Sequence, residues 1–82
     1  METMQERDNQ ISEEVSNELH QIRQQQRPFN SAHEAYGVIS EEVAEFFDEV
    51  RLKRKDRNPL RMRHELTQIA AVAIRAATDL TF

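Results

Sequence analysis

Three glutamates stand close together in the stretch SAHEAYGVISEEVAEFFDEV, which runs from Ser31 to Val50. If this stretch is helical, Glu41, Glu42 and Glu45 lie within about one turn of each other, and like charges at that spacing repel by about 0.2–0.5 kcal/mol per pair. A bound divalent cation would offset this repulsion. A solvated acidic helix face is the plain alternative, and the residues alone leave both interpretations open.

A second pair of oxygen-bearing side chains, Glu65 and Gln68, follows at a spacing of three residues. On a helical wheel, Glu42 and Glu45 lie at the edge of an apolar stripe, and Glu65 and Gln68 lie beside the stripe of the next segment. If the two segments pack antiparallel, the four side chains face one another. Carboxylate and amide oxygens suit Mg²⁺, with Mn²⁺ as a substitute. The spacing therefore allows a metal site here, and a solvated acidic face stays the default interpretation of the residues alone. A ferritin-like di-iron site is excluded, because it needs Glu-x-x-His pairs and no histidine follows a glutamate at that spacing.

Helices must position these side chains, since the chain has one glycine and two prolines and its apolar residues recur with helical spacing. A first helix is predicted from about residue 8 to 26, with residues 1–7 as a frayed end. Ser31 and Glu34 match a capping box and open a second helix that runs to about residue 54. Asn58-Pro59 supplies a cap and a first-turn proline for a third helix, to about residue 80.

The expected core faces follow from the same periodicity. In the first helix they comprise Ile11, Val15, Leu19 and Ile22; in the second, Ala32, Ala35, Ile39, Val43, Phe46 and Val50; in the third, Met62, Leu66, Ile69, Ala70, Ala73, Ile74, Ala77 and Leu80. Gly37 costs about 1 kcal/mol relative to alanine inside a helix. Close approach of another helix, or of a ligand, would explain it.

The predicted fold is therefore all-α: one domain, residues 1–82, forming an antiparallel bundle of three main helices. The second and third helices pair across the short basic connection, and the first lies across them. A chain of 82 residues hides only about 60 % of its unfolded surface. We therefore expect oligomerisation to complete the bundle, as a dimer at least.

Composition narrows the function classes. The chain has no cysteine, no apolar run long enough to cross a membrane and no signal-like start, so we expect a cytoplasmic protein. The net charge of −4 argues against stable nucleic-acid binding.

Seven of the eleven basic residues fall between positions 51 and 63. Lys53, Arg54, Arg61 and Arg63 are candidate phosphate contacts, although basic residues at a helix end also complement its dipole. Arg75 is a further phosphate candidate, and a salt bridge to Asp79 four residues later competes with that role.

At these residues the sequence resembles the MazG-like, all-α nucleoside triphosphate pyrophosphohydrolase family. The family's pattern is E-E-x-x-E followed by E-x-x-D. Here EEVAE occupies 41–45 and ELTQ occupies 65–68, and HEAY at 33–36 resembles the stretch upstream of the first motif. The resemblance extends from about Glu18 to Leu80.

The resemblance implies a Mg²⁺-dependent hydrolase that releases a nucleoside monophosphate and pyrophosphate. It implies that Glu42, Glu45 and Glu65 are metal ligands and that Glu41 is a further ligand or orients the attacking water. It also allows a dimer or a tetramer.

Gln68 departs from the family pattern, because it stands where the family has aspartate. An amide oxygen can still bind Mg²⁺ but brings no negative charge. Two alternatives therefore stay open: a noncatalytic or weakly active dimerisation or regulatory module that keeps the fold, and a coiled-coil-like adaptor whose acidic residues are merely solvated.

Overall fold

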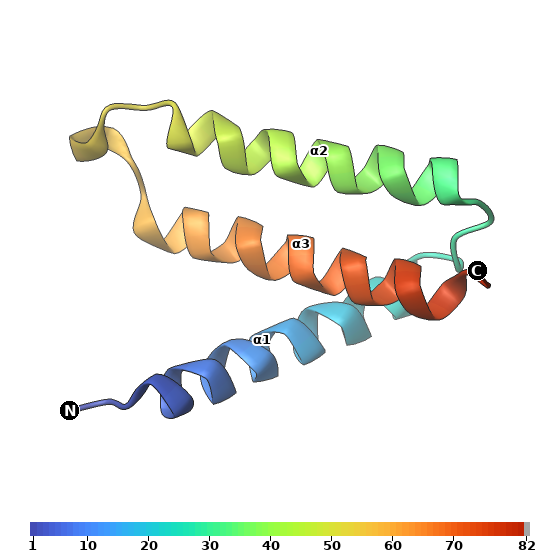
Figure 1. The fold of residues 1–82 in the computed structure, drawn as a ribbon, viewed down its shortest axis with the longest axis horizontal. Helices are drawn as coiled ribbons and strands as arrows, with labels where there is room; N and C mark the ends of the chain where they lie inside the picture. Colours follow the sequence, from blue (N-terminus) through green and yellow to red (C-terminus); the bar gives the residue numbers. More distant parts are fainter. Residues whose placement is uncertain (82) are drawn as a thin grey trace.

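Three long helices make up the computed structural model of the protein, which describes residues 1–81. In chain order they are α1 (Met4–Gln25), α2 (Ala32–Val50) and α3 (Pro59–Asp79), with a single 3₁₀ turn, η1 (Arg54–Asp56), between α2 and α3. Helices α2 and α3 form an antiparallel hairpin, and α1 continues the layer on the other side of α3 (Figure 1). The predicted all-α class and the antiparallel pairing of the second and third helices are confirmed.

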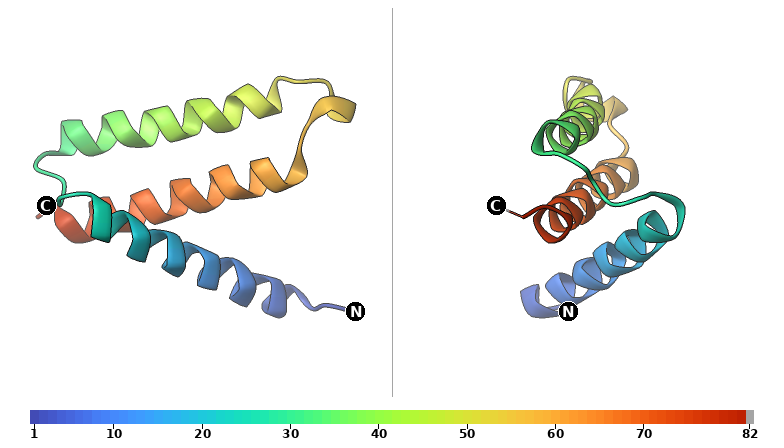
Figure 2. Two further views of the ribbon diagram at one scale, coloured as in Figure 1. Left: turned by 180° about the vertical axis from the view of Figure 1, so that it is seen from behind. Right: turned by 90° about the vertical axis from the view of Figure 1, so that its right-hand side faces the viewer.

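Helix α3 is the central element, because it packs against both α1 and α2. The two views of Figure 2 show α1 crossing beside α3, with its N-terminal half diverging from the hairpin. We expected the first helix to lie across both others, but it packs chiefly on α3. None of the helices in residues 1–81 combines the length and the apolar character that a membrane crossing requires.

Helix α1 begins at Met4, about four residues earlier than predicted, so residues 4–7 are helical rather than a frayed end. The reason is a cap that the sequence analysis overlooked. The hydroxyl oxygen of Thr3 accepts a hydrogen bond from the backbone N–H of Glu6 at 3.1 Å. This bond satisfies one of the amide groups that have no partner within the first helical turn.

The predicted caps of the other two helices are confirmed. Ser31 accepts a hydrogen bond from the backbone N–H of Glu34 at 3.1 Å. Asn58 accepts from the backbone N–H groups of Leu60 and Arg61, and Pro59 occupies the first turn of α3. In both cases a short polar side chain replaces the missing intrahelical acceptor.

Helix α2 ends at Val50, before the predicted end near residue 54. Arg57 explains the early end, because its guanidinium donates to the carbonyl oxygens of Val50 and Leu52 and so satisfies acceptors at the helix terminus. The buried carboxylate of Glu49 accepts from the backbone N–H of Asn58 at 2.6 Å. Together these bonds fix the turn that aligns α2 with α3.

The hydrophobic core is small and lies toward one end of the hairpin. Its buried members are Phe29, Ala35, Val72 and Ala76, with Ile22, Val38, Ile39 and Leu80 packed against them. Phe29 therefore packs at the entry to α2 and is part of the core. Among the described residues no large side chain is completely buried, which is typical of a domain near the lower size limit.

The buried face of α3 differs from the predicted face. The buried residues are Thr67, Ala71, Val72, Arg75 and Ala76. By contrast, Leu66, Ala73, Ile74 and Ala77, which we expected in the core, are exposed. On α2, Val43 was also expected in the core and is 47 % exposed. These residues form an apolar surface outside the protomer core.

Candidate metal centre

Glu42, Glu45 and Glu65 form a compact cluster between α2 and α3. One carboxylate oxygen from each residue lies within 4.8 Å of the oxygens of the other two. The antiparallel hairpin produces this arrangement, because Glu42 and Glu45 occupy successive turns of α2 and Glu65 approaches from α3. The structure thus brings together three of the four predicted metal ligands.

Two of these carboxylates have an oxygen without a partner. Atom Oε2 of Glu42 and atom Oε2 of Glu65 are buried, and neither has a hydrogen-bond partner in the part of the chain that the structure describes. Buried polar atoms are normally paired, since an unpaired one costs about 1–3 kcal/mol. Three converging oxygen donors with unpaired buried atoms fit a hard cation such as Mg²⁺, which takes oxygen ligands.

The electrostatics of the cluster also favour a positive partner. Burial raises the pKa of Glu42 above its usual value, and the negative charges of Glu45, Glu65 and Glu18 raise it further. Burial likewise raises the pKa of Glu65, with the neighbouring Glu45 adding to the effect and His64 and Arg61 opposing it. Each ionised carboxylate therefore disfavours the ionisation of its neighbour.

Glu18 is a fourth acidic residue near this cluster, and the sequence analysis missed it. It lies on α1, and its charge is one of those that raise the pKa of Glu42. Its Oε1 atom accepts a hydrogen bond from Nε2 of Gln68, at 3.5 Å. The sequence does place Glu14 and Glu18 beside the apolar stripe of α1, and that position was the available signal. In the structure both side chains are half-buried.

Gln68 lies one turn after Glu65 on α3, beside Glu18 of α1, and its role as a metal ligand stays a prediction. Its amide nitrogen is directed at Glu18, and its carbonyl oxygen is the atom that could bind a cation. Glu18 supplies a negative charge next to the position where the family pattern has an aspartate.

Glu41 is not brought into the cluster. Its side chain is exposed, because it is one residue before Glu42 and therefore turned by about 100° around α2. Two roles were predicted for Glu41, metal binding and orientation of the attacking water. Its exposed position outside the cluster fits the second role better, and both stay predictions.

The candidate phosphate contacts occupy different positions. Lys53 and Arg54 are exposed in the connection between α2 and α3, beyond the end of the cluster. Arg61 is exposed on the first turns of α3, and its charge lowers the pKa of Glu65, so it lies near the cluster. Arg63 instead forms an ion pair with Glu14 of α1, with Nη2 and Oε1 2.8 Å apart.

Arg75 has a structural role. Its guanidinium lies 3.7 Å above the centre of the Phe29 ring and donates to the backbone oxygen of Arg27 at 2.8 Å. It also pairs with Asp79, with Nε and Oδ2 3.6 Å apart, as the competing interpretation predicted. Arg75 is only 8 % exposed, so these contacts hold its side chain in place.

A half-open cavity of about 380 Å³ adjoins the cluster, and Glu42 belongs to both. Its wall also includes Arg27, Glu34, Phe29 and Arg75. Arg27 and Glu34 form an ion pair with Nη2 and Oε2 2.6 Å apart. The lining of the cavity therefore combines a carboxylate of the cluster with two guanidinium groups.

Comparison with known proteins adds no relative: no family model matches the chain, and no curated protein or solved structure matches it.

Proposed function

We propose that the protein is a Mg²⁺-dependent nucleoside triphosphate pyrophosphohydrolase of the MazG-like type. The observation that supports this proposal most directly is the convergence of Glu42, Glu45 and Glu65 from two helices. Two of their buried carboxylate oxygens have no hydrogen-bond partner within residues 1–81. The motif resemblance supplies the substrate class, and the cavity beside Glu42 offers space for part of a nucleotide.

In this proposal Glu42, Glu45 and Glu65 hold the ion, with Glu18 adding negative charge and Gln68 an amide oxygen. Bound Mg²⁺, or Mn²⁺ in its place, would offset the charge of the triphosphate oxygens. Water attacks the α-phosphorus, the bond from that phosphorus to the oxygen bridging toward the β-phosphorus breaks, and pyrophosphate leaves. Phosphoryl chemistry of this kind needs positioning and charge neutralisation more than covalent help from the protein.

The remaining residues have supporting roles in the same proposal. Glu41, exposed beside Glu42, orients the attacking water. Arg61 contacts the phosphate chain from the start of α3, with Lys53 as a second contact from the connection. Arg75 forms part of the cavity wall, where its bonds to Arg27 and Asp79 keep its charge in one place.

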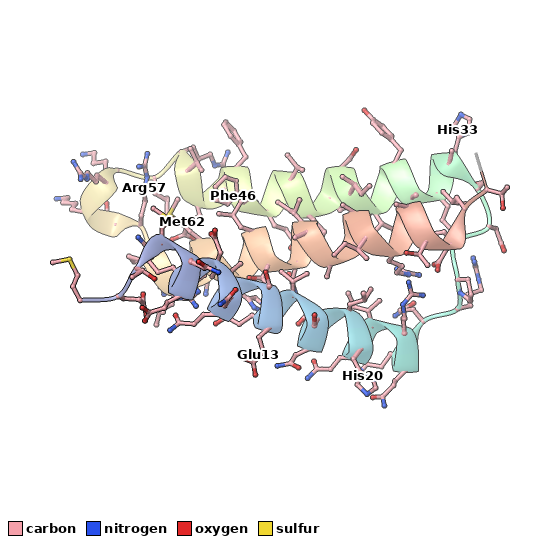
Figure 3. The ribbon with its side chains drawn as sticks, turned by 60° about the horizontal axis from the view of Figure 1, so that its bottom comes forward. Glu13, His20, His33, Phe46, Arg57 and Met62 are labelled. Carbon is pink, nitrogen blue, oxygen red and sulfur yellow. The ribbon has the colours of Figure 1, made fainter. Side chains whose placement is uncertain are left out.

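The test is release of pyrophosphate from a panel of ribo- and deoxynucleoside triphosphates, with Mg²⁺ and with a chelator. Glu42→Gln and Glu65→Gln are each expected to lower kcat/KM on the order of 100-fold or more, since each removes a charged ligand. Glu13→Gln is the matched control, because Glu13 is exposed on α1 and points away from the other helices (Figure 3). Equal activity of the Glu42 and Glu13 variants would contradict the proposal.

A noncatalytic module that keeps the fold is the second candidate, and Gln68 is the observation that favours it. A family-type aspartate at this position would add a fourth carboxylate to the cluster; the glutamine contributes only an amide. The same assay separates the two candidates. If neither the natural chain nor Gln68→Asp hydrolyses any nucleotide, the module is the better description.

A further inference from the structure

The connection between α2 and α3 concentrates the positive charge of the chain. Residues 51–63 contain seven basic residues and one acidic residue, which give this stretch a net charge of +6. The whole chain carries −4, so the other residues carry −10. Figure 1 shows the connection, with η1, at one end of the α2–α3 hairpin. The protein therefore has a basic end on an otherwise acidic molecule.

Most basic side chains of this connection are exposed and have no acidic partner. Arg51 is 3.5 Å from Asp48, but both side chains of this pair are more than 60 % exposed. A surface pair of this kind contributes at most about 1 kcal/mol, so Arg51 can exchange its partner for a ligand. The exposed basic residues of the stretch that form no ion pair within residues 1–81 are Lys53, Arg54, Lys55 and Arg61. We call these four residues and Arg51 the basic tip.

Neither the fold nor the proposed activity accounts for the whole basic tip. The carboxyl end of a helix attracts cations, which explains Arg51 at the end of α2. The proposed activity uses Lys53 and Arg61. Arg54 and Lys55 lie on η1, beyond the end of α2, and have no role in either.

The backbone of the connection is held in place from the inside. Arg57 is the half-buried basic residue of this stretch, and it donates to the carbonyl oxygens of Val50 and Leu52. The buried carboxylate of Glu49 accepts from the backbone N–H of Asn58 at 2.6 Å. The exposed cations therefore project from a fixed turn. A ligand would bind them without first having to order the loop, which lowers the entropic cost of binding.

Two large apolar side chains are exposed in the same stretch, and they help to identify the ligand. Leu52 is 40 % exposed and Leu60, at the start of α3, is 78 % exposed. Residues 51–63 contain no aromatic residue. Proteins that bind single-stranded nucleic acid combine basic residues with aromatic side chains on which bases stack. Basic residues with aliphatic neighbours instead suit the boundary between lipid headgroups and acyl chains.

The acidic remainder of the protein leaves the basic tip accessible to an anionic surface. The molecule is 40 Å long, and exposed charges more than about 8 Å apart are largely screened at physiological ionic strength. The nearest acidic residues of α2 are engaged, Asp48 with Arg51 and Glu49 with Asn58. The acidic first turns of α1 lie on the other side of α3 from η1 in both Figure 1 and Figure 2.

We propose that the basic tip attaches the protein to the surface of a membrane that contains anionic phospholipids. The cations pair with the phosphate and carboxylate groups of the headgroups, and Leu52 enters the headgroup layer. Surface attachment needs no helix that crosses the bilayer, in agreement with the helices of residues 1–81. It is also independent of the proposed activity, because Arg54, Lys55 and Leu52 lie outside the groups assigned to hydrolysis.

Co-sedimentation of the full chain with phospholipid vesicles tests the proposal, in buffer without nucleotide or divalent ions. The chain is expected to sediment with vesicles of equal parts phosphatidylcholine and phosphatidylserine and to stay in solution with phosphatidylcholine alone. Raised salt should release it, because salt screens the attraction. Lys55→Gln and Arg54→Gln are each expected to weaken binding about fivefold, which corresponds to about 1 kcal/mol per basic residue near an anionic surface.

Gln25→Glu is the matched control, because it changes the net charge by the same amount as Lys55→Gln. Gln25 is exposed and is the last residue of α1, and that end of α1 lies far from η1 (Figure 1). This variant should therefore retain the binding of the natural chain. Circular dichroism checks that every variant keeps its helix content.

Leu52→Ser tests the apolar part of the contact. It is expected to weaken binding to the mixed vesicles without changing the salt dependence, because it removes apolar surface and no charge. An unchanged affinity of this variant would exclude Leu52 from the contact.

Several results would overturn the attachment itself. The natural chain would then bind neither kind of vesicle, or bind both equally. Equal losses in Lys55→Gln and Gln25→Glu would show that net charge governs binding and that the basic tip does not. Binding to single-stranded RNA oligonucleotides without binding to the mixed vesicles would overturn it in favour of a nucleic-acid surface.

Discussion

The carboxylates of Glu42 on α2 and Glu65 on α3 have oxygens within 4.8 Å of each other, and each residue also has one buried oxygen without a hydrogen-bond partner among the described residues. Two ionised groups at this distance repel and are poorly solvated, so the metal-free cluster opposes folding. A bound cation would reverse the sign of that contribution. The free energy of unfolding should therefore report directly on cation binding at this cluster, without an enzymatic assay.

The first prediction concerns Glu42→Gln without metal. Removing this charge is expected to raise the free energy of unfolding at pH 7 by about 0.2–0.5 kcal/mol for each like-charge contact removed. The pKa of Glu42 is raised in the folded protein, so its charge costs stability above that pKa. The cost disappears as the pH falls toward the unfolded value, and the gain from the substitution should shrink with it. Urea unfolding at several pH values measures the difference.

Added Mg²⁺ or Mn²⁺ should have the opposite effect on the natural protein. An ion at 100 times its dissociation constant stabilises by about 2.7 kcal/mol, and Glu42→Gln should lose most of that gain. Glu13→Gln, on the outer side of α1, should retain it. The metal-site assignment fails if the natural chain and the Glu42 variant respond equally to the ion.

The second prediction separates Glu18 from its neighbour Glu14. If Glu18 supplies charge to the cluster, Glu18→Gln should weaken Mn²⁺ binding about tenfold or more. Gln68→Asp should strengthen binding, because affinity for hard cations rises with the charge of the ligands. Glu14→Gln is the matched control, since Glu14 lies one turn away on α1 and pairs with Arg63. Titration calorimetry measures all three, and unchanged affinity in Glu18→Gln would remove Glu18 from the site.

The third prediction concerns Asp79, which fastens α3 to the chain around Phe29. Its Oδ1 atom accepts from Nη1 of Arg23 at 2.9 Å, and its Oδ2 atom accepts from the backbone N–H of Phe29 at 3.1 Å. The hydrogen bond from Arg23 contributes most to lowering the pKa of Asp79 below its ordinary value near 3.8, with further contributions from Phe29 and Arg75. This carboxylate therefore stabilises the fold only while it is ionised.

The sign of the pH effect follows from the lowered pKa. The stabilisation by Asp79 is complete above the unfolded pKa and is lost as the pH falls through the folded pKa. Asp79→Asn should be less stable than the natural chain at neutral pH, and the difference should close in acid. Thermal unfolding followed at 222 nm from pH 7 to about pH 2.5 measures it, since this range extends below the ordinary aspartate pKa of about 3.9. A constant difference across the range would show that Asp79 acts through packing instead of charge.

Local signals in the sequence were sufficient for the helix boundaries that depend on caps. Ser31 and Asn58-Pro59 act on amides two or three residues away, so their effect does not depend on the rest of the fold. The overlooked cap at Thr3 has the same form. The end of α2 was misplaced because it depends on Arg57, which returns to Val50 from beyond the turn.

The buried face of α3 could not be predicted in the same way. Apolar residues surround most of this helix, so periodicity does not tell which side meets α1 and α2. Which side of α3 is buried depends on contacts with residues far along the chain. As a result, Thr67 and Arg75 are buried while Leu66 and Ile74 are exposed. Glu18 was missed for the same reason, because nothing local connects α1 to the acidic motif.

The fourth prediction concerns Gly37 in the interior of α2. Gly37→Ala is expected to stabilise the chain by about 1 kcal/mol, because alanine is the better helix former. A Cβ atom there meets nothing within 4 Å, so no clash offsets the gain. For a domain of this size the gain corresponds to a rise in Tm of about 4–8 °C. Thermal unfolding of the natural chain and of the Gly37→Ala variant measures the gain. A loss of stability in Gly37→Ala would contradict the open surroundings of this residue and would show that the added methyl group meets a neighbour.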